Sequence, residues 1–309
     1  MKTIIIGAGA MGCLFAARLS LSGNQVNLID IDPEVLLAIR SHGIRLNMEN
    51  SEKEQVYVPV HSADQLSEHF DLVLVLTKGG ATEGAIKAAR HLIAADTRVL
   101  TLQNGLGNAD VLAKFIDPAT ILHGVTTLAA DLEAPGVIQC KGQGDLHWWS
   151  YDGQYDPFMA KLHDTFLVAG LSSVLNPDVA EYIWEKAAFN AALNGLCTLL
   201  DKKVGEVGNQ ERGQRLIENI VVECGKVARH SGAMFDQKKV LKNIEHAIRY
   251  QAQHIPSMLQ DRRAGHASEV ILLHESIVRL SKQHDLRTPV LETLCDLLIL
   301  GEPDSYRVE

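Results

Sequence analysis

The chain has 309 residues, of which 46% are hydrophobic and 22% are charged, proportions that are ordinary for a globular protein. Its formal net charge of −9, from 29 basic and 38 acidic residues, argues against nucleic acid or an anionic membrane surface as a partner. No apolar run approaches the roughly 18 residues that a membrane-spanning helix needs. We therefore expect a cytoplasmic protein, and a chain of this length favours two domains over one.

The cysteines and histidines indicate neither a disulfide framework nor a metal site. The five cysteines are spread over the whole chain without a C-x-x-C pair, as expected of small buried side chains in a reducing compartment. None of the 13 histidines occurs in an H-x-x-x-H pattern or in metal-ligand spacing with a cysteine. We expect no metal ion.

A glycine-rich turn near the start of the sequence predicts a dinucleotide-binding site. Residues 3–6 form a β-branched run, and Gly7, Gly9 and Gly12 form G-x-G-x-x-G where this strand must turn into a helix over residues 10–21. Gly7 permits the tight turn, Gly9 lets a pyrophosphate approach the backbone, and Gly12 lets helix and strand pack closely. The helix N-terminus faces the phosphates with unpaired N–H groups and a partial positive charge.

A second strand is predicted over residues 25–29, and it ends in Asp30. A carboxylate at this position accepts hydrogen bonds from both adenosine ribose hydroxyls of a bound dinucleotide. The competing interpretation is that Asp30 merely ends a strand. Asp32, by contrast, is interpreted as the N-cap of the next helix, with Pro33 at its first position. With strand, glycines and spacing all in place, we favour Asp30 as a cofactor-binding residue.

Two further strands are predicted to end near the same crevice. The apolar run at residues 72–76 suits a buried parallel strand and leads to Lys78, and a strand over residues 98–102 leads to Asn104. Ligands of doubly wound sheets bind at the carboxyl ends of the strands, so Lys78 is a candidate for a cofactor or substrate contact. A solvated loop lysine is an equal alternative, and Asn104-Gly105 is also typical of a tight turn.

The whole pattern predicts an α/β fold, with an N-terminal Rossmann dinucleotide-binding domain over residues 1–176 and an all-helical C-terminal domain over residues 177–309. Short alternating runs between residues 121 and 149 predict antiparallel strands that extend the first sheet. Helical periodicity dominates after Asn176-Pro177. Helices are expected over residues 82–94, 178–200, 211–231, 237–254, 266–284 and 289–300. We expect the active site between the two domains.

One helix of the second domain carries a polar row. Lys186, Asn190 and Asn194 are spaced at i, i+4 and i+8 and therefore lie on one face, surrounded by alanines and a leucine. Such surroundings desolvate the lysine in part, which lowers its pKa and makes it a better proton donor near neutral pH. From the pattern alone, a solvated stripe of lysine and asparagines is an equally good interpretation.

Several segments together make the chain resemble the ketopantoate reductase family. They are G-A-G-A-M-G, which begins at Gly7, the residue Lys78, then Q-N-G-L-G-N around Asn104, W-E-K-A-A-F-N-A-A-L-N around Lys186, and P-S-M-L-Q-D-R-R-A-G-H-A-S-E, which ends at Glu269. These segments occur in family order and cover essentially the whole chain. The resemblance implies an NADP-dependent 2-oxoacid reductase with a Rossmann domain and a helical C-terminal domain.

The resemblance also implies roles for individual residues. Lys186 is the expected general acid at the keto oxygen, and Asn190 and Asn194 are expected to hold hydroxyl or carboxylate groups of the substrate. Asn104 is expected to border nicotinamide and substrate. The residues expected to bind the cofactor are Gly7, Gly9, Ala10, Met11, Gly12, Asp30, Lys78 and Asn104.

Ser257 and Glu269 enter the site through the resemblance alone. Ser257 is expected to bind the substrate carboxylate, and Glu269, which we count with Lys186 as catalytic, is expected to complete the polar cluster. The alternatives are a helix N-cap for Ser257, which precedes two apolar residues, and an ordinary surface glutamate at position 269.

Two departures from the family pattern affect the cofactor and the surroundings of the site. Members of the family carry an arginine just after the second strand, which pairs with the 2′-phosphate of NADP, whereas this chain has Asp30-Ile31-Asp32. The family segment T-E-I-D-x-I-N-G is replaced by S-E-V-I-L-L-H-E, which loses an acid and puts His274-Glu275 in place of asparagine-glycine. We therefore predict NAD(H) as the preferred cofactor, with NADP(H) as the alternative that the family implies.

The function implied by the resemblance is hydride transfer between a nicotinamide cofactor and a 2-oxoacid or 2-hydroxyacid. The first hypothesis is a 2-dehydropantoate 2-reductase, which converts ketopantoate to pantoate in pantothenate biosynthesis. The alternative is an NAD-dependent D-2-hydroxyacid dehydrogenase that acts on a branched or aromatic, mandelate-like substrate. A hypothesis of another class is a non-catalytic nucleotide-binding sensor, because a fold alone does not imply chemistry. The expected partner is a small-molecule 2-oxoacid, with no nucleic acid and no membrane, and a homodimer is left open.

Overall fold

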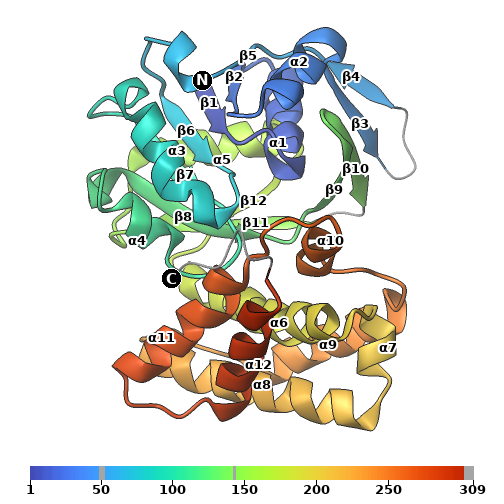
Figure 1. Cartoon of the computed structure of the whole chain (residues 1–309). Coiled ribbons are helices and arrows are strands. Elements are labelled where there is room, and N and C mark those ends of the chain that lie inside the picture. Colours follow the sequence, from blue (N-terminus) through green and yellow to red (C-terminus); the bar gives the residue numbers. More distant parts are fainter. Residues whose placement is uncertain (49–52, 142–143, 303–309) are drawn as a thin grey trace. The chain divides into compact units, whose positions relative to one another are not determined.

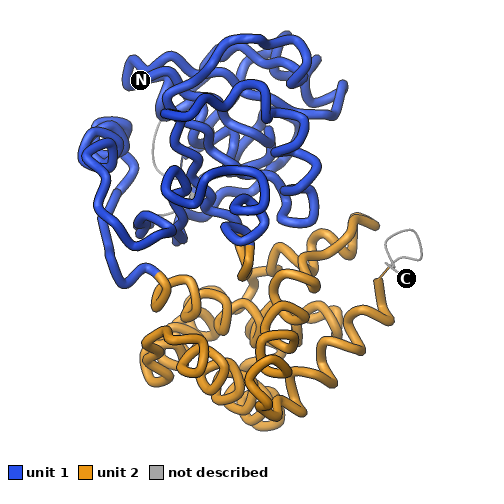
Figure 2. Tube along the Cα trace, turned by 90° about the vertical axis from the view of Figure 1, so that its left-hand side faces the viewer, with its two compact units in different colours: residues 1–103, 108–179 blue, residues 104–107, 180–309 orange. Residues whose placement is uncertain are grey.

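The computed structural model describes residues 1–48, 53–141 and 144–302. The chain forms two units, shown in different colours in Figure 2. Unit 1 comprises Met1–Gln103 and Asn108–Val179, and unit 2 comprises Asn104–Gly107 and Ala180–Glu309. A short segment from the N-terminal half of the chain thus belongs to the second unit. The sequence suggested a single boundary at residue 176, which would leave Asn104–Gly107 in the first domain. That boundary stays a prediction.

Unit 1 is built on a sheet of eight strands. In spatial order these are β12 (Ser172–Leu175), β11 (Asp145–Ser150), β8 (Ile121–Thr126), β7 (Arg98–Thr101), β6 (Leu72–Val75), β1 (Lys2–Ile6), β2 (Gln25–Ile29) and β5 (Val60–His61). All neighbours in this sheet are parallel except β8 and β11. The central strands β1, β6 and β7 are apolar and almost fully buried, as expected of a parallel sheet covered on both faces.

The strand order reverses between β1 and β6. Successive strands run outward in one direction from β1 to β2 and β5, and in the other from β6 to β7 and β8. Ligands of doubly wound sheets bind beyond the carboxyl ends of the strands at such a point. The backbones approach closely here, because a Cβ on Gly7, after β1, would lie 2.9 Å from the backbone nitrogen of Thr77, after β6. The predicted Rossmann architecture is confirmed.

Helices flank this sheet (Figure 1), and they are α1 (Ala10–Leu21), α2 (Pro33–His42), α3 (Thr82–Ala89), α4 (Asn108–Leu112) and α5 (Pro157–Val168). The helix predicted over residues 82–94 is shorter, since α3 ends at Ala89 and residues 90–92 form a 3₁₀ turn. Neither α5 nor β12 was predicted. The signal for α5 was Asp156-Pro157, because the Asp156 carboxylate caps this helix and Pro157 is its first residue.

A second, four-stranded sheet has the order β4 (Glu54–Val56), β3 (Ile44–Met48), β10 (Val137–Lys141) and β9 (Ala129–Ala134). Helix α1 contacts strands of both sheets, which explains why it is apolar around most of its circumference. The prediction that residues 121–149 extend the first sheet with antiparallel strands was wrong in part. β8 joins that sheet in parallel and only β11 joins it antiparallel, whereas β10 pairs in parallel with the distant strand β3.

Unit 2 is helical, as predicted. Its elements are α6 (Val179–Leu200), α7 (Val204–Gly208), α8 (Glu211–His230), α9 (Gln237–Tyr250), α10 (Ser257–Arg263), a π-helical turn (Ile271–Glu275), α11 (Ser276–Gln283) and α12 (Pro289–Leu300). Helix α6 is buried along most of its length and contributes Ala188, Ala191 and Leu193 to the core of this unit. Within the residues that the structure describes, no helix has the length and apolarity needed to cross a membrane.

Two helices of unit 2 differ from their predicted bounds. The helix predicted over residues 237–254 stops at Tyr250, several residues before Pro256. The helix predicted over residues 266–284 begins only near Val270, and its first turn is a π-helix. The reason is Gly265, whose φ of +72° places the end of α10 in the left-handed region that ends helices. The short helix α7 was not predicted, and of α10 only a helix start near Ser257 was anticipated.

The close packing of Gly12 against the backbone of Gly7 gives a test of stability. A Cβ on Gly12 would overlap the carbonyl oxygen of Gly7, and no side-chain rotation removes an overlap with backbone. We expect Gly12→Ala to lower the free energy of unfolding by about 3 kcal/mol, measured by urea titration. The control is Gly84→Ala in α3, where a Cβ meets nothing within 4 Å. This control should raise the free energy of unfolding by about 0.5–1 kcal/mol, and equal stability of both variants would contradict the packing described.

Candidate active site

The glycine loop after β1 has the geometry of a dinucleotide cradle. Gly7 has a φ of +104°, which side chains disfavour. Gly9 is the N-cap of α1 without a side-chain cap, and a Cβ there would meet nothing within 4 Å. The first turn of α1, which contains Ala10 and Met11, has no acidic residue that would compete with an anion for the positive helix end. The residues present therefore fit a bound pyrophosphate.

The Asp30 carboxylate lies beside this loop. One of its oxygens accepts the N–H of Ala8 at 2.6 Å, and the other accepts the N–H groups of Ile31 and Asp32 at 2.8 and 3.0 Å. These bonds take three of the roughly four acceptor sites of a carboxylate, so capacity remains for a ribose hydroxyl. That Asp30 accepts both ribose hydroxyls stays a prediction. Asp32 caps α2 by accepting the N–H of Glu34, as predicted.

Polar side chains connect the residues that follow β6 and β7. The side-chain amide of Gln103 donates to the carbonyl oxygen of Thr77 at 2.7 Å and to the Thr82 hydroxyl at 2.9 Å. Lys78, the neighbour of Thr77, is exposed in this loop, which is compatible with both of its predicted roles. Gln103 was not among the residues predicted from the sequence. Its position directly after a buried strand, at the edge where ligands bind, was the available signal.

Lys186 and Glu269 form the charged part of the candidate site in unit 2. Burial of Lys186 on α6 lowers its pKa to about 8, and the negative charge of Glu269 opposes that shift. A lysine with such a pKa is still largely protonated at neutral pH, yet it releases its proton far more readily than an exposed lysine. The structure thus brings the two residues that were expected to be catalytic into one electrostatic pair.

The two asparagines of the polar row are almost fully buried. Asn190 and Asn194 are 8% and 7% exposed, and they follow Lys186 along one face of α6. This burial excludes the solvated stripe that the sequence pattern left open. Buried amides offer directional donors and acceptors, which suit the carboxylate or hydroxyl of a small ligand.

Asn104 belongs to the segment Asn104–Gly107. This segment follows β7 and precedes α4 in the sequence, but it is part of unit 2. The N–H of Leu106 donates to the carbonyl oxygen of Leu272 at 3.1 Å, and the Leu106 side chain joins the core of unit 2. Gly105 has a φ of +86°, and a Cβ there would lie 2.6 Å from the Leu272 oxygen. The backbone next to Asn104 is therefore fixed against the π-helical turn that follows Glu269.

Ser257 lies at the start of α10 and is exposed. Pro256 rather than Ser257 occupies the N-cap, so the interpretation of Ser257 as a helix cap was wrong. An exposed hydroxyl next to the first N–H groups of a helix suits a carboxylate. The role of Ser257 in the site stays a prediction.

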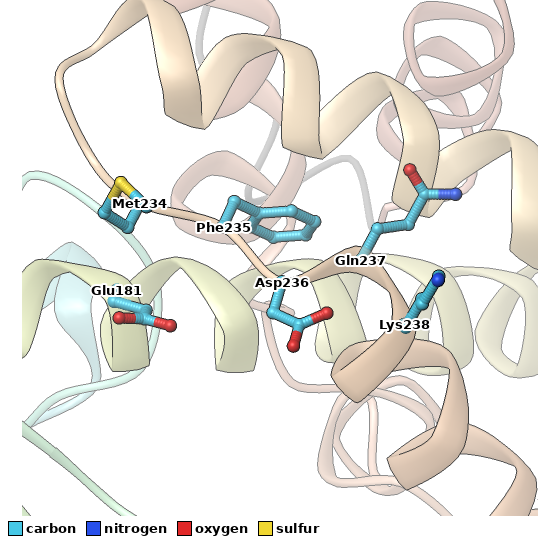
Figure 3. A pocket seen from close by; sticks show the side chains of 6 residues that line it. All are labelled: Glu181, Met234, Phe235, Asp236, Gln237 and Lys238. Carbon is cyan, nitrogen blue, oxygen red and sulfur yellow. The ribbon is translucent and has the colours of Figure 1, made fainter.

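An open pocket of about 550 Å³ lies in unit 2 at the start of α9 (Figure 3). It is lined by Glu181, Met234, Phe235, Asp236, Gln237 and Lys238. None of the predicted site residues is among them, and the Asp236 carboxylate is engaged as the N-cap of α9. We therefore assign this pocket no part in the chemistry.

Thiol chemistry has no support in the structure. All five cysteines are buried and unbridged, which confirms that they are small buried side chains. Burial raises the pKa of the Cys13, Cys197 and Cys295 thiols to about 12, so they are not nucleophiles near neutral pH. In the part of the chain that the structure describes, no group of three or more His, Cys, Asp or Glu side chains is arranged to hold a metal ion.

Comparisons with known proteins cover both units. The family model described as Ketopantoate reductase PanE/ApbA matches residues 3–153, and the model of its C terminal matches residues 178–302. The chain is similar to the 2-dehydropantoate 2-reductase of Lactococcus lactis, with 30% identity over 96% of this chain and 97% of the relative. For the enzyme of the same name from Halobacterium salinarum, the identity is 31% over 99% and 100% of the two chains.

Among solved structures, the chain is similar to the ternary structure of D-mandelate dehydrogenase with NADH and anilino(oxo)acetate. The TM-score is 0.94, and 32% of the residues are identical over 100% of both chains. It is also similar to the crystal structure of 2-dehydropantoate 2-reductase from Geobacter metallireducens, with a TM-score of 0.92, 27% identity and coverage of 97% and 100%. These similarities extend over the residues of unit 1 that are predicted to bind a cofactor and over the buried polar residues of unit 2.

The open space at Gly9 permits a test of the cradle that is separate from folding. Because a Cβ at position 9 meets no protein atom within 4 Å, Gly9→Ala should keep the free energy of unfolding within about 1 kcal/mol of the wild type. The added methyl group should weaken NADH binding at least about tenfold, because it takes the space that the pyrophosphate needs. Fluorescence titration with NADH measures this, with Gly84→Ala as control. Unchanged affinity in a folded Gly9→Ala protein would mean that the pyrophosphate does not bind at this loop.

Proposed function

The chain belongs to the ketopantoate reductase family of nicotinamide-dependent oxidoreductases, and from that membership we propose that it reduces a 2-oxoacid to the 2-hydroxyacid with NADH. One observation carries the proposal. Lys186, whose burial lowers its pKa to about 8, is paired with Glu269 in the unit that also buries Asn190 and Asn194. Bound NADH supplies the hydride for the carbonyl carbon.

Lys186 supplies the proton in this proposal. Reduction of a keto group places negative charge on its oxygen, and a positioned acid stabilises that charge as it develops. Glu269 keeps Lys186 protonated at neutral pH, and burial makes the lysine acidic enough to release the proton. In the reverse reaction, neutral Lys186 takes the proton of the hydroxyacid.

The remaining polar residues hold the substrate. Asn190 and Asn194 bind a hydroxyl or carboxylate group through their buried amides, and Asn104 borders nicotinamide and substrate. Ser257 and the first N–H groups of α10 bind the carboxylate. A neutral amide in place of the carboxylate forfeits this charge-assisted recognition.

Two substrates compete. Ketopantoate is the first candidate because the two relatives described above are named 2-dehydropantoate 2-reductases and match over almost their whole length. A branched or aromatic 2-oxoacid is the second, because D-mandelate dehydrogenase with NADH matches the complete chain. A non-catalytic sensor has no specific observation in its favour. A cytoplasmic location and a homodimer stay predictions.

A substrate panel tests the proposal. Purified protein is mixed with NADH and either ketopantoate, phenylglyoxylate or 3-methyl-2-oxobutanoate, and the loss of NADH absorbance gives kcat/KM for each. The highest value identifies the side chain that the site accepts. If none of these acids is reduced, the proposal is wrong.

The cofactor preference follows from the surroundings of Asp30. NADP carries a phosphate of about −1.5 to −2 charge where NAD has a free hydroxyl, and a carboxylate fixed beside the glycine loop repels it. No arginine occurs at positions 30–35. Arg40, the nearest along the chain, is held elsewhere, because its guanidinium donates to the Val60 carbonyl at 3.1 Å and to the Gln65 side chain at 2.9 Å. We therefore propose NADH as the preferred cofactor.

Removing the proposed acid should abolish most turnover. We expect Lys186→Ala to lower kcat by about 10²–10⁴-fold while NADH affinity, which depends on unit 1, changes less than about twofold. In the wild type, Lys186 must be protonated for reduction, so kcat/KM should be constant well below pH 8, reach half its plateau near the lysine pKa of about 8 and fall about tenfold per pH unit well above it.

The charge on Glu269 is the second influence, after burial, on the pH at which this downturn lies. Because that charge raises the pKa of Lys186, Glu269→Gln should move the downturn to lower pH. The control is Glu181→Gln, on the same helix as Lys186, which should leave the pH of the downturn unchanged. A Lys186→Ala protein that is folded and turns over at nearly the normal rate would exclude Lys186 as the acid.

Kinetics with both cofactors test the role of Asp30. We expect the wild type to prefer NADH over NADPH by at least about tenfold in kcat/KM, which corresponds to roughly 1.4 kcal/mol. The double variant Asp30→Ser, Ile31→Arg should narrow or reverse this preference. Ile31→Arg alone is the control that separates an added positive charge from the loss of the carboxylate. Wild-type preference for NADPH would show that Asp30 does not face the ribose.

A further inference from the structure

The π-helical turn Ile271–Glu275 leaves one carbonyl oxygen available to another segment. The N–H of Ser276 bonds to the carbonyl of Ile271, five residues back, instead of that of Leu272, four residues back. The Leu272 carbonyl accepts the Ser276 hydroxyl at 2.6 Å and the N–H of Leu106 at 3.1 Å. Because π-helical turns are rare and concentrate at functional sites, this turn requires an explanation beyond helix formation.

The same turn buries a histidine against α6. The His274 side chain is 0% exposed, and its Nε2 lies 3.0 Å from the carbonyl oxygen of Ala191. A carbonyl can only accept, so Nε2 carries the proton and Nδ1 does not. Among the described residues, nothing hydrogen-bonds to Nδ1. Burial lowers the pKa of the ring to about 4, so His274 is a neutral donor throughout the neutral pH range.

A glycine on α6 makes room for this ring. A Cβ on Gly195 would overlap Nε2 of His274, so the close approach depends on the absence of a side chain there. Ala191, which accepts the bond, follows Asn190 directly and precedes Asn194 by three residues. The bond from His274 therefore fixes α6 at the level from which both buried amides project.

The turn thus holds two segments of the proposed site at once. Through the Leu272 carbonyl it holds the backbone beside Asn104, and through His274 it holds the helix that carries Asn190 and Asn194. A side chain that served packing alone could be apolar, whereas the ring of His274 donates through Nε2 to the Ala191 carbonyl at 3.0 Å. This bond points to the donor rather than the volume of the ring as the important property.

We propose that the π-helical turn Ile271–Glu275 positions the substrate-binding residues of unit 2, and that His274 is a positioning residue that acts through Ala191 of α6. This inference rests on the proposed function, because it assigns Asn104, Asn190 and Asn194 to substrate binding.

Two substitutions at His274 separate the effect of its hydrogen-bond donor from the effect of its side-chain volume. His274→Met fills the space without a donor, and His274→Gln supplies a neutral N–H of similar reach. For the 2-oxoacid that the wild type reduces fastest, His274→Met should raise KM at least about tenfold while the Kd of NADH changes less than about twofold. His274→Gln should keep KM within about threefold of the wild type. Equal losses in both variants, or an unchanged KM in His274→Met, would overturn the proposal.

Hydrogen exchange gives a readout that does not depend on turnover. In protein without substrate, the amides of residues 188–196 should exchange at least about tenfold faster in His274→Met and at the wild-type rate in His274→Gln. If the wild type reduces no 2-oxoacid, the proposed function fails, while these rates still decide whether His274 holds α6. Unchanged exchange in His274→Met would overturn its positioning role.

A second variant covers the case in which His274→Met does not fold. Gly105→Ala should displace the segment from the Leu272 oxygen, since its Cβ would lie 2.6 Å away, and should raise KM at least about tenfold. Gly23→Ala is the matched control, because Gly23 has a φ of +85° but open space around its Cβ. This control should change KM less than about twofold. Equal KM values for the two variants would contradict positioning by the turn.

Discussion

The candidate site depends on one constraint: Lys186 must stay protonated although the helix that carries it is largely buried. Ala187 and Ala188, which follow Lys186 on α6, are at most 2% exposed. Burial among such residues favours the neutral amine of Lys186. Glu269 opposes this effect from another segment of unit 2, and the balance leaves a pKa of about 8. Neither segment alone produces this value, so the distance between α6 and the residues before the π-helical turn must be set accurately.

Local signals were sufficient for several elements whose structure depends on neighbouring residues. The β1 strand, the glycine turn and α1 follow from a short apolar run and three glycines, and the helix predicted over residues 178–200 is observed as Val179–Leu200. The helix at Pro289–Leu300 has its predicted bounds. The row of Lys186, Asn190 and Asn194 was likewise readable from spacing, because the period of a helix fixes which residues share a face.

Local sequence patterns could not predict features that depend on residues far apart in the chain. The parallel pairing of β10 with β3 joins segments that no local periodicity relates, and the burial of Asn190 and Asn194 depends on how the other helices pack. His274 was visible in the sequence only as a departure from a family pattern. Its partner Ala191 lies 83 residues earlier, so the contact required the folded chain. The bond from the Ala8 N–H to Asp30 is a similar case at shorter range.

The segment Asn104–Gly107 also bears on how far the helical unit is a module. Leu106 is a core residue of unit 2, although the rest of that unit begins at Ala180. A fragment that starts at residue 180 lacks this side chain and therefore carries a gap in its own interior. Recombination between relatives at a single crossover would separate Leu106 from the core shaped to receive it. To exchange the helical unit intact between relatives, recombination would have to transfer Asn104–Gly107 together with the part of the chain that begins at Ala180.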